Sequence, residues 1–330
     1  MFRLLKFITF PRIINILKLI VSFWASRIAG KPLIWGRPFA VSVEPGTACN
    51  LYCPECPTGA AILGRPKGRM SLSLFKKIIG ELSPELTVLN LYLQGEPFLH
   101  PEFTEMVKIA SEKKLYTITS TNGQIFNRKI AEDIVDNGLS EIYFSLDGVT
   151  QETYSRYRKG GSLEKVKSAV RTLVAVRREK KSHFPKIIVQ FIVFRHNEHE
   201  ADEFVKLAKE LGADKAEIKT AQFNEFSKGE VEPPVDPRYR RYADAEARKL
   251  KGRPYNHCWK SWMSMAFTWN GEALPCCYDK DGIHSMGEFK GNFNELWFGN
   301  KNISFKAAIL QKRSEIDICK NCPEGRNFIF

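Results

Sequence analysis

The sequence has no cysteine between Cys56 and Cys258, and its eight cysteines therefore fall into two widely separated groups. Disulfide frameworks are typical of secreted domains, whereas metal ligands cluster in short loops. The grouping favours metal ligation by free thiols and a reducing, cytoplasmic compartment. The groups are Cys49, Cys53 and Cys56 near the start, and Cys258, Cys276, Cys277, Cys319 and Cys322 near the end.

Acidic residues are absent before Glu44, although the chain as a whole contains 37 of them. The same stretch holds seven basic residues: Arg3, Lys6, Arg12, Lys18, Arg27, Lys31 and Arg37. The net charge of +13 is thereby concentrated at this end, and the remainder carries an ordinary excess for its size. We therefore do not expect nucleic-acid binding, which usually requires a basic face on the folded domain.

A long apolar run is also missing from this N-terminal stretch. Its longest uncharged segment, residues 19–26, is far shorter than the roughly 18 residues that span a bilayer. A narrow polar stripe recurs at helical spacing among large apolar side chains: Asn15, Lys18, Ser22 and Ser26. We expect residues 1–37 to form a basic amphipathic helix on an anionic lipid surface, peripheral on the inner membrane face. Packing on the protein itself, or on a partner, is the alternative.

Apolar runs rich in β-formers alternate with amphipathic helical stretches along residues 38–229. Strands are predicted at 39–43, 87–93, 116–121, 141–146, 186–194 and 215–219. Helices are predicted at 72–82, 102–113, 128–137, 162–178, 199–211 and 237–250. Right-handed β/α crossovers would curl the parallel sheet into a partial TIM-like (β/α)6 barrel of the α/β class. We expect residues 230–252 to link this barrel to a small cysteine-rich domain at 253–330.

Three cysteines at Cx3Cx2C spacing follow the first predicted strand. Cys49, Cys53 and Cys56 can supply three thiolates to a cubane iron–sulfur cluster, which takes four protein ligands when it is structural. The fourth iron would then be open to a reacting ligand. A half zinc site or a disulfide is the alternative for this loop taken alone. The loop lies at the carboxyl rim of the sheet, where α/β folds place their sites.

The loop resembles the signature of the radical S-adenosylmethionine (SAM) superfamily, and motifs at later strand ends share that resemblance. They are Gln94-Gly95-Glu96-Pro97, Thr121-Asn122-Gly123, Ser145-Leu146-Asp147-Gly148 and Arg158-Lys159-Gly160-Gly161. The first resembles the family's Gly-Gly-Glu-Pro motif, with Gln94 in place of one glycine. Each motif alone is more typical of a turn than of a site, but all stand in the family's order.

The resemblance implies that the open iron of a [4Fe–4S] cluster chelates SAM. One electron, from an external reductant of the flavodoxin or ferredoxin type, then cleaves SAM to methionine and a 5′-deoxyadenosyl radical. The cofactor-binding residues that the resemblance implies are Tyr52, Gly95, Glu96, Pro97, Asn122, Ser145 and Arg158. Among them, the Arg158 guanidinium is chemically suited to the SAM carboxylate.

The C-terminal cysteines surround a predicted hairpin. Asn270-Gly271 is a two-residue turn signal, and Cys276 is expected on the return strand. Four thiolates could meet here, for which zinc is one interpretation. The pattern also resembles the SPASM/twitch tail of radical SAM enzymes, in the single-cluster form of 2-deoxy-scyllo-inosamine dehydrogenase. That resemblance implies a second [4Fe–4S] cluster held by Cys258, Cys276, Cys319 and Cys322. Cys277 is left over, as a free thiol or as the ligand in place of Cys276.

These features predict an oxidoreductase acting on a sugar, a cyclitol or a lipid-linked substrate. The auxiliary cluster would accept the electron that the substrate radical loses, and Asp279 is the candidate general base. A peptide-modifying maturase is the alternative. Such enzymes often carry a leader-binding domain before the barrel, whereas the 48 residues before Cys49 resemble a lipid-surface helix. A non-catalytic or RNA-binding metalloprotein is a further alternative.

Overall fold

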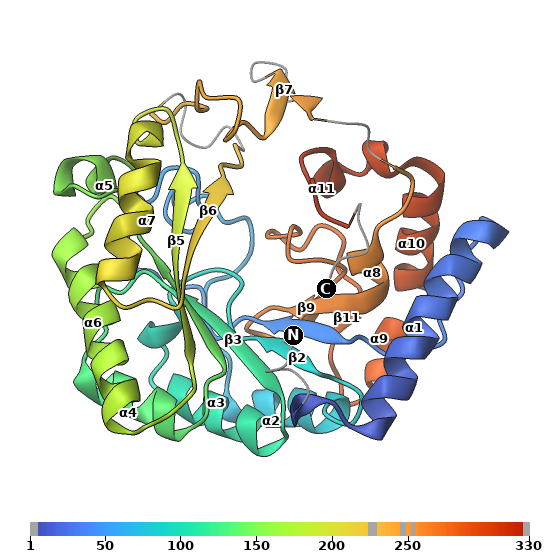
Figure 1. The fold of residues 1–330 in the computed structure, drawn as a ribbon. Coiled ribbons are helices and arrows are strands. Elements are labelled where there is room, and N and C mark those ends of the chain that lie inside the picture. Colours follow the sequence, from blue (N-terminus) through green and yellow to red (C-terminus); the bar gives the residue numbers. More distant parts are fainter. Residues whose placement is uncertain (1–5, 224–229, 245–248, 252–254, 326–330) are drawn as a thin grey trace.

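One nine-stranded sheet organises the molecule (Figure 1). The computed structural model describes residues 6–223, 230–244, 249–251 and 255–325. The strand order is β11-β10-β9-β1-β2-β3-β4-β5-β6, and the neighbours from β1 to β6 are parallel. Within the described ranges β6 and β11 do not pair, so the sheet is a partial barrel, as predicted. The parallel strands are β1 (Ala40–Val43), β2 (Val88–Asn90), β3 (Tyr116–Thr121), β4 (Glu141–Ser145), β5 (Lys186–Val193) and β6 (Lys215–Thr220).

Helices cover the outer face of this sheet (Figure 1). They are α2 (Leu72–Leu82), α3 (Phe103–Glu112), α4 (Arg128–Asp136), α5 (Gln151–Tyr157), α6 (Leu163–Glu179) and α7 (Ala201–Glu210). Ser71, Asn127 and Ser162 cap three of them, because each side-chain oxygen accepts the backbone N–H three residues on. The apolar faces of these helices pack against the strands and form most of one hydrophobic core.

The C-terminal region joins the same sheet instead of forming a separate one. Strand β9 (Ser264–Phe267) pairs in parallel with β1, and β10 (Glu272–Leu274) returns antiparallel to β9. The predicted hairpin is therefore present, with Gly271 at φ +84° in its turn. Cys276 lies two residues beyond the end of β10 and not on the strand itself. The remaining elements are β11 (Gly287–Glu288), α8 (Trp259–Met263), α9 (Phe293–Trp297), α10 (Asn300–Lys312) and α11 (Asp317–Lys320).

The helix predicted at 237–250 is wrong. The described part of this stretch forms an antiparallel pair, β7 (Tyr242–Asp244) with β8 (Lys249–Leu250), and residues 245–248 lie outside the described residues. The Tyr242 ring is buried, and its hydroxyl donates to Asn321 at 2.7 Å and accepts the Phe223 N–H at 3.0 Å. Tertiary contacts of this kind override local helical propensity.

Helix α1 (Phe10–Ala29) lies on the outside of the molecule, beside α8, α9 and α10 (Figure 1). The predicted polar stripe is turned inward, since Asn15, Ser22 and Ser26 are buried, whereas Lys18 is exposed. The helix thus packs on the protein's own fold. Among the described helices, none combines the length and the hydropathy needed to cross a membrane.

Candidate active site

The first three cysteines lie in the loop after β1, at the carboxyl end of the parallel strands. They open onto a cavity of about 180 Å³ together with residues from the ends of β2, β3 and β4. Five of the seven residues assigned to SAM binding line this cavity: Gly95, Glu96, Asn122, Ser145 and Arg158. Tyr52 and Pro97 are not part of the lining; the Tyr52 ring is largely exposed, and its backbone N–H donates to the Lys159 carbonyl at 3.0 Å.

The motif after β2 packs directly on the cysteine loop. Gly95 has φ +75°, and a Cβ at this position would lie 2.4 Å from the carbonyl oxygen of Gly46. Only glycine tolerates both the positive φ and this close approach. The backbone N–H of Glu96 then donates to the Ala48 carbonyl at 2.7 Å. The way the two loops meet therefore requires glycine at position 95 and places the backbone of Glu96 against the cysteine loop.

The Glu96 carboxylate is buried and held by three donors. It accepts hydrogen bonds from Thr121 Oγ1 at 2.8 Å, from the Asn122 N–H at 2.7 Å and from the Phe98 N–H at 3.3 Å. Burial raises the pKa of Glu96 to about 7, although these hydrogen bonds oppose the shift. A carboxylate fixed in this way can accept a hydrogen bond from an amino group placed in the cavity.

Arg158 presents its guanidinium between the cysteine loop and β4. Its Nε donates to the Asp147 carboxylate, and its Nη1 lies 3.7 Å from Cys53 Sγ. Asp147 is itself fully buried and accepts the Ile192 N–H at 2.6 Å, which fixes the orientation of the arginine. Sequence reasoning missed this anchoring role, although Asp147 stands in the quoted Ser-Leu-Asp-Gly motif.

Amide side chains approach the other two cysteines. Asn122 Nδ2 lies 3.8 Å from Cys49 Sγ, and Gln94 Oε1 lies 3.8 Å from Cys56 Sγ. Gln94 Oε1 also accepts the Thr58 hydroxyl at 3.1 Å. From the sequence, Gln94 was notable only as a departure from the family motif. In the structure its side chain lies against the cysteine loop.

The chemistry of this donor set fits an iron–sulfur cluster. Burial raises the pKa of the Cys53 thiol to about 11, and only the Arg158 charge opposes this. Such thiols become thiolates when a metal centre supplies positive charge. Among the described residues, no three metal-ligating side chains converge on a single-ion site. A cubane spreads its ligands instead, with one thiolate on each iron corner, and Cys49, Cys53 and Cys56 would hold three of them.

The cysteines of the tail come from three segments, and their thiols lie near enough to raise one another's pKa. They are Cys258 before α8, Cys276 after β10, Cys319 in α11 and Cys322 just beyond it. The buried Arg313 guanidinium lies among them and donates to the carbonyls of His257 at 2.8 Å and Glu324 at 2.7 Å. Burial raises the pKa of Cys319 to about 12 and that of Cys322 to about 11, and Arg313 opposes both shifts. The tail thus repeats the arrangement of buried or partly buried thiols beside a fixed cation.

Gly325 sets the approach between two of these cysteines. A Cβ at Gly325 would lie 2.4 Å from Cys258 Sγ, and its φ of +69° also favours glycine. Its carbonyl accepts the Trp259 N–H at 3.1 Å, and the preceding Glu324 N–H donates to Cys322 Sγ at 3.4 Å. One turn therefore contacts Cys258 and Cys322 together, a role that sequence reasoning did not assign.

Cys277 and Asp279 follow Cys276 in the same loop. A hydrogen bond between the two thiols raises the pKa of Cys276 and lowers that of Cys277. The Asp279 carboxylate is buried, which raises its pKa, and it accepts the N–H groups of Ile283 and His284, both at 2.9 Å. These bonds direct the carboxylate toward its own loop.

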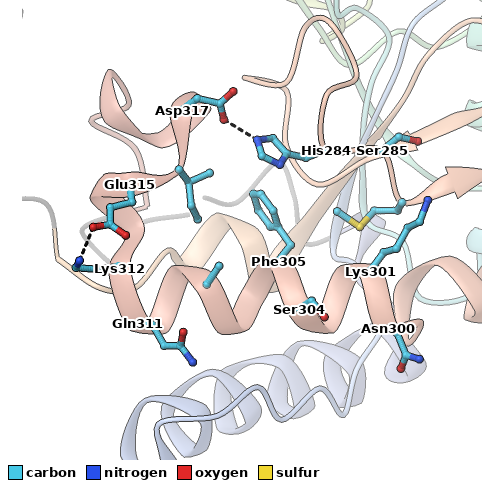
Figure 2. Close-up of a pocket in the computed structure, with 13 residues that line it drawn as sticks. His284, Ser285, Asn300, Lys301, Ser304, Phe305, Gln311, Lys312, Glu315 and Asp317 are labelled. Carbon is cyan, nitrogen blue, oxygen red and sulfur yellow. Dashed lines mark hydrogen bonds and ion pairs between the residues drawn. The ribbon is translucent and has the colours of Figure 1, made fainter.

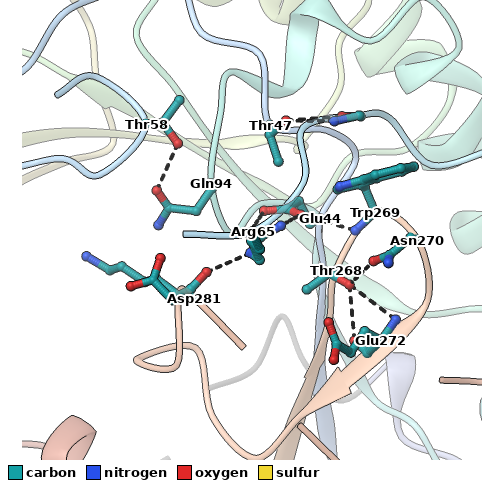
Figure 3. Close-up of polar contacts among 12 residues, drawn as sticks. Glu44, Thr47, Thr58, Arg65, Gln94, Thr268, Trp269, Asn270, Glu272 and Asp281 are labelled. Carbon is teal, nitrogen blue, oxygen red and sulfur yellow. Dashed lines mark hydrogen bonds and ion pairs between the residues drawn. The ribbon is translucent and has the colours of Figure 1, made fainter. Parts of the chain in front are cut away.

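A buried ion pair fastens the first cysteine loop to the tail (Figure 3). Arg65, in the segment after Cys56, makes a two-pronged contact with Glu44, which directly follows β1. Glu44 also accepts the Trp269 N–H at 3.1 Å, and Arg65 Nε donates to the Lys280 carbonyl at 2.6 Å. The two cysteine groups are thereby fixed relative to each other.

A wider hollow of about 840 Å³ lies on the tail, along α10 and the loop before β11. Figure 2 shows His284 pointing at Asp317 across it, with Nε2 and Oδ1 2.6 Å apart. None of the cysteines and none of the residues assigned to SAM lines this hollow. It is therefore separate from the candidate active site.

Two family models match the regions that carry these sites. The model of the radical SAM superfamily matches residues 43–211, and that of the SPASM iron–sulfur cluster-binding domain matches residues 258–323. The chain belongs to the radical SAM superfamily. Within it, the chain is an enzyme with a SPASM tail, and its cofactors are SAM and [4Fe–4S] clusters.

Curated relatives match somewhat more than half of this chain. PqqA peptide cyclase of Bradyrhizobium diazoefficiens is 27% identical over 190 residues, which cover 57% of this chain and 48% of the relative. Mycofactocin maturase MftC of Mycobacterium ulcerans is 30% identical over 176 residues, covering 53% and 46%. The chain spans about half the length of these relatives.

Solved structures share the fold across most of the chain. BtrN in complex with AdoMet and 2-DOIA has a TM-score of 0.53 at 18% identity, covering 88% of this chain and 95% of BtrN. SuiB of Streptococcus suis bound to S-adenosylmethionine has a TM-score of 0.66 at 14% identity, covering 88% and 72%. At these identities the likeness concerns the fold.

Proposed function

We propose that this enzyme oxidises a carbon that bears a hydroxyl group, in a sugar, a cyclitol or a lipid-linked substrate. Cys49, Cys53 and Cys56 would hold the cluster that, once reduced by an external flavodoxin- or ferredoxin-type protein, would cleave SAM and supply a 5′-deoxyadenosyl radical. The substrate C–H bond breaks and its hydrogen atom passes to that radical. The hydroxyl proton then passes to a base and the remaining electron to the auxiliary cluster, which leaves a carbonyl. The observation that carries this proposal is the second group of buried thiols, fastened to the first through Glu44 and Arg65.

The residues of the cavity have distinct tasks in this proposal. Glu96 would hold the amino group of SAM, and Arg158, which Asp147 orients, would hold its carboxylate. Ser145 and Asn122 contact the ribose side, and the backbone of Tyr52 faces the adenine. Gly95 and Pro97 shape the loop that carries Glu96. Cys258, Cys276, Cys319 and Cys322 hold the auxiliary cluster.

The inner face of the sheet supports a polar substrate. Ser145 lines the cavity, and the strand register places it beside Gln190, which in turn lies beside Glu217. Partners at one register position point to the same face of a sheet. Gln190 Nε2 lies 3.4 Å from Glu217 Oε2, so a row of hydrogen-bonding groups leads away from the SAM site. Such a row suits a hydroxylated head group better than an apolar one.

Asp279 is the proposed general base. Its raised pKa favours proton uptake, while its two backbone hydrogen bonds require the loop at 279–284 to open before it can reach a substrate. Asp279→Asn should therefore slow product formation and leave the cleavage of SAM intact.

We place the enzyme in the cytoplasm, at the inner face of a membrane. Free thiols and an oxygen-sensitive cofactor require a reducing compartment. The apolar side of α1 faces outward, and a lipid-linked substrate would be met at such a surface.

Peptide modification is the second candidate function. Its support is that the curated relatives that match this chain include PqqA peptide cyclase and a mycofactocin maturase. A short precursor peptide encoded beside this gene would favour it, whereas neighbouring sugar or lipid enzymes would favour the oxidation.

Anaerobic reconstitution with SAM and a strong reductant tests the proposed reaction. We expect about eight irons per chain, for two cubanes, and release of 5′-deoxyadenosine. Cys49→Ala should abolish SAM cleavage, whereas Cys319→Ala should retain cleavage and lose substrate oxidation. Deuterium transfer from labelled candidate substrates into 5′-deoxyadenosine would identify the carbon attacked. About four irons in the wild-type enzyme would contradict the two-cluster proposal.

A further inference from the structure

Helix α1 turns a continuous apolar face away from the protein. The exposed side chains on this face are Phe10, Ile13, Ile14, Leu17, Val21, Trp24 and Ile28. Ile28 is 87% and Phe10 75% exposed, so neither is covered by the rest of the described chain. Large contiguous patches of this kind mark interaction sites on proteins.

Arg12 anchors the inner side of the helix by an unusual route. Its buried guanidinium donates to the carbonyls of Ser83 and Lys113, both at 3.0 Å. These residues are the C-caps of α2 and α3, where unpaired carbonyls and the helix dipole favour a cation. Arg12 thus ties α1 to the backbone at the ends of two neighbouring helices.

Further contacts fix the rotation of α1 about its own axis. Asn15 exchanges two hydrogen bonds of 2.8 Å with the backbone of Arg37. Phe23 packs between Trp259 and Trp262, at ring centroid distances of 5.2 and 5.7 Å. The apolar side chains are therefore held outward by specific contacts on the opposite side, and this face exists before any partner binds.

Positive charge borders the apolar face on both sides. At 3.6 residues per turn, Lys18 and Arg27 lie at opposite edges of the arc formed by the exposed apolar residues. The Arg27 guanidinium lies 4.7 Å from the centre of the Trp24 ring, and both side chains are exposed. The sequence has no acidic residue before Glu44, so α1 itself carries no negative charge.

We infer that the outward face of α1 is a preformed docking surface for an anionic lipid bilayer. Apolar side chains would enter the headgroup boundary, while Lys18 and Arg27 extend to the phosphates on either side. A second copy of the chain is a poorer occupant, because two such helices would bring like charges together without an acidic partner. This inference depends on the proposed function in one respect only, namely that the surface it binds is the cytoplasmic face of the membrane.

Vesicle flotation of the reconstituted enzyme tests the inference. We expect the enzyme to float with vesicles of phosphatidylcholine and phosphatidylglycerol, and much less with phosphatidylcholine alone or at high salt. Val21→Glu should abolish flotation, because it places a charge at the centre of the face. Val205→Glu is the matched control, since Val205 on α7 is 45% and Val21 52% exposed, and it should float like the wild type.

Charge-reversal variants distinguish binding to anionic lipid from non-specific hydrophobic adsorption. Lys18→Glu and Arg27→Glu should each weaken binding to the anionic vesicles by at least about fivefold, from the usual contribution of one basic residue near the surface. Equal flotation of Val21→Glu and wild type would overturn the inference, as would dimerisation that depends on Val21 without flotation. SAM cleavage measured without lipid should be unchanged in these variants, so failure of docking and failure of the proposed chemistry are distinguishable.

Discussion

At the scale of single residues, the most consequential group is the buried carboxylate of Glu96. It is surrounded by donors and lies against the cysteine loop, yet burial outweighs those donors and holds its pKa near 7. Its charge therefore changes within the range in which the enzyme would work. The same carboxylate is the proposed partner of the SAM amino group, so its protonation would also affect the cofactor.

Glu96→Gln gives a pH-dependent test of this environment. A folded-state pKa above the unfolded value stabilises the protein at low pH, and this contribution is lost as the pH rises through about 7. Relative to Glu96→Gln, the wild type should lose about 2 kcal/mol of unfolding free energy between about pH 5 and pH 7. Denaturant unfolding of both proteins across this range measures the difference. A difference that does not change with pH would show that Glu96 titrates normally.

Gly325→Ala tests the close approach at the tail cysteines. The added methyl group would meet Cys258 Sγ, so the auxiliary site should fail to assemble while the first site remains. Iron content should fall from about eight toward about four per chain, with 5′-deoxyadenosine still formed. Gly30→Ala is the matched control, because Gly30 also has positive φ but nothing lies within 4 Å of its Cβ position. Retention of full iron content in Gly325→Ala would argue against this packing.

At the scale of elements, the loop after the first cysteines and the hairpin of the tail act as one unit. The Glu44–Arg65 pair is almost completely buried, and it ties the end of β1 to the segment that precedes α2. A buried pair of this kind is strongly destabilising when only one partner is removed.

Arg65→Met should therefore lower the unfolding free energy by about 3–5 kcal/mol, because it leaves the Glu44 carboxylate buried without its partner. The double variant Arg65→Met with Glu44→Gln should be more stable than Arg65→Met alone. Where the single variant still folds, SAM cleavage should continue with less product per 5′-deoxyadenosine, since the two sites are no longer fixed together. Additive effects of the two substitutions would contradict a direct coupling.

Local patterns predicted many of the elements but not their long-range partners. The strand at 116–121 and the helix at 72–82 have the predicted bounds, the latter because Ser71 supplies a clear cap. The pairing of β9 with β1 has no local signal, since it joins segments more than two hundred residues apart. The orientation of α1 also could not be predicted from the sequence, because it depends on Asn15 being buried against the backbone of another segment.

The candidate site follows the same division. Its cysteines and the motifs at strand ends could be predicted from the sequence, because their chemistry requires particular residue types at short spacing. The roles of Asp147, Gln94, Arg313 and Gly325 were not predicted, because each acts on a cysteine or on Arg158, which only the fold brings near.

At the scale of the whole molecule, barrel and tail share one continuous sheet. Strand β1 lies between β2 and β9, so the strand that carries the first cysteine loop is paired on one side by the barrel and on the other by the tail. The distance between the two cysteine groups is therefore set by adjacent strands and not by a hinge between domains.

This shared sheet limits how the enzyme can be divided. A fragment that ends before residue 253 would leave β1 as an open edge, with unsatisfied backbone groups ready to pair with another chain. We expect such a fragment to aggregate instead of folding as a minimal SAM-cleaving enzyme. A replacement tail would therefore have to supply a strand that fits β1 as well as a place for its cofactor.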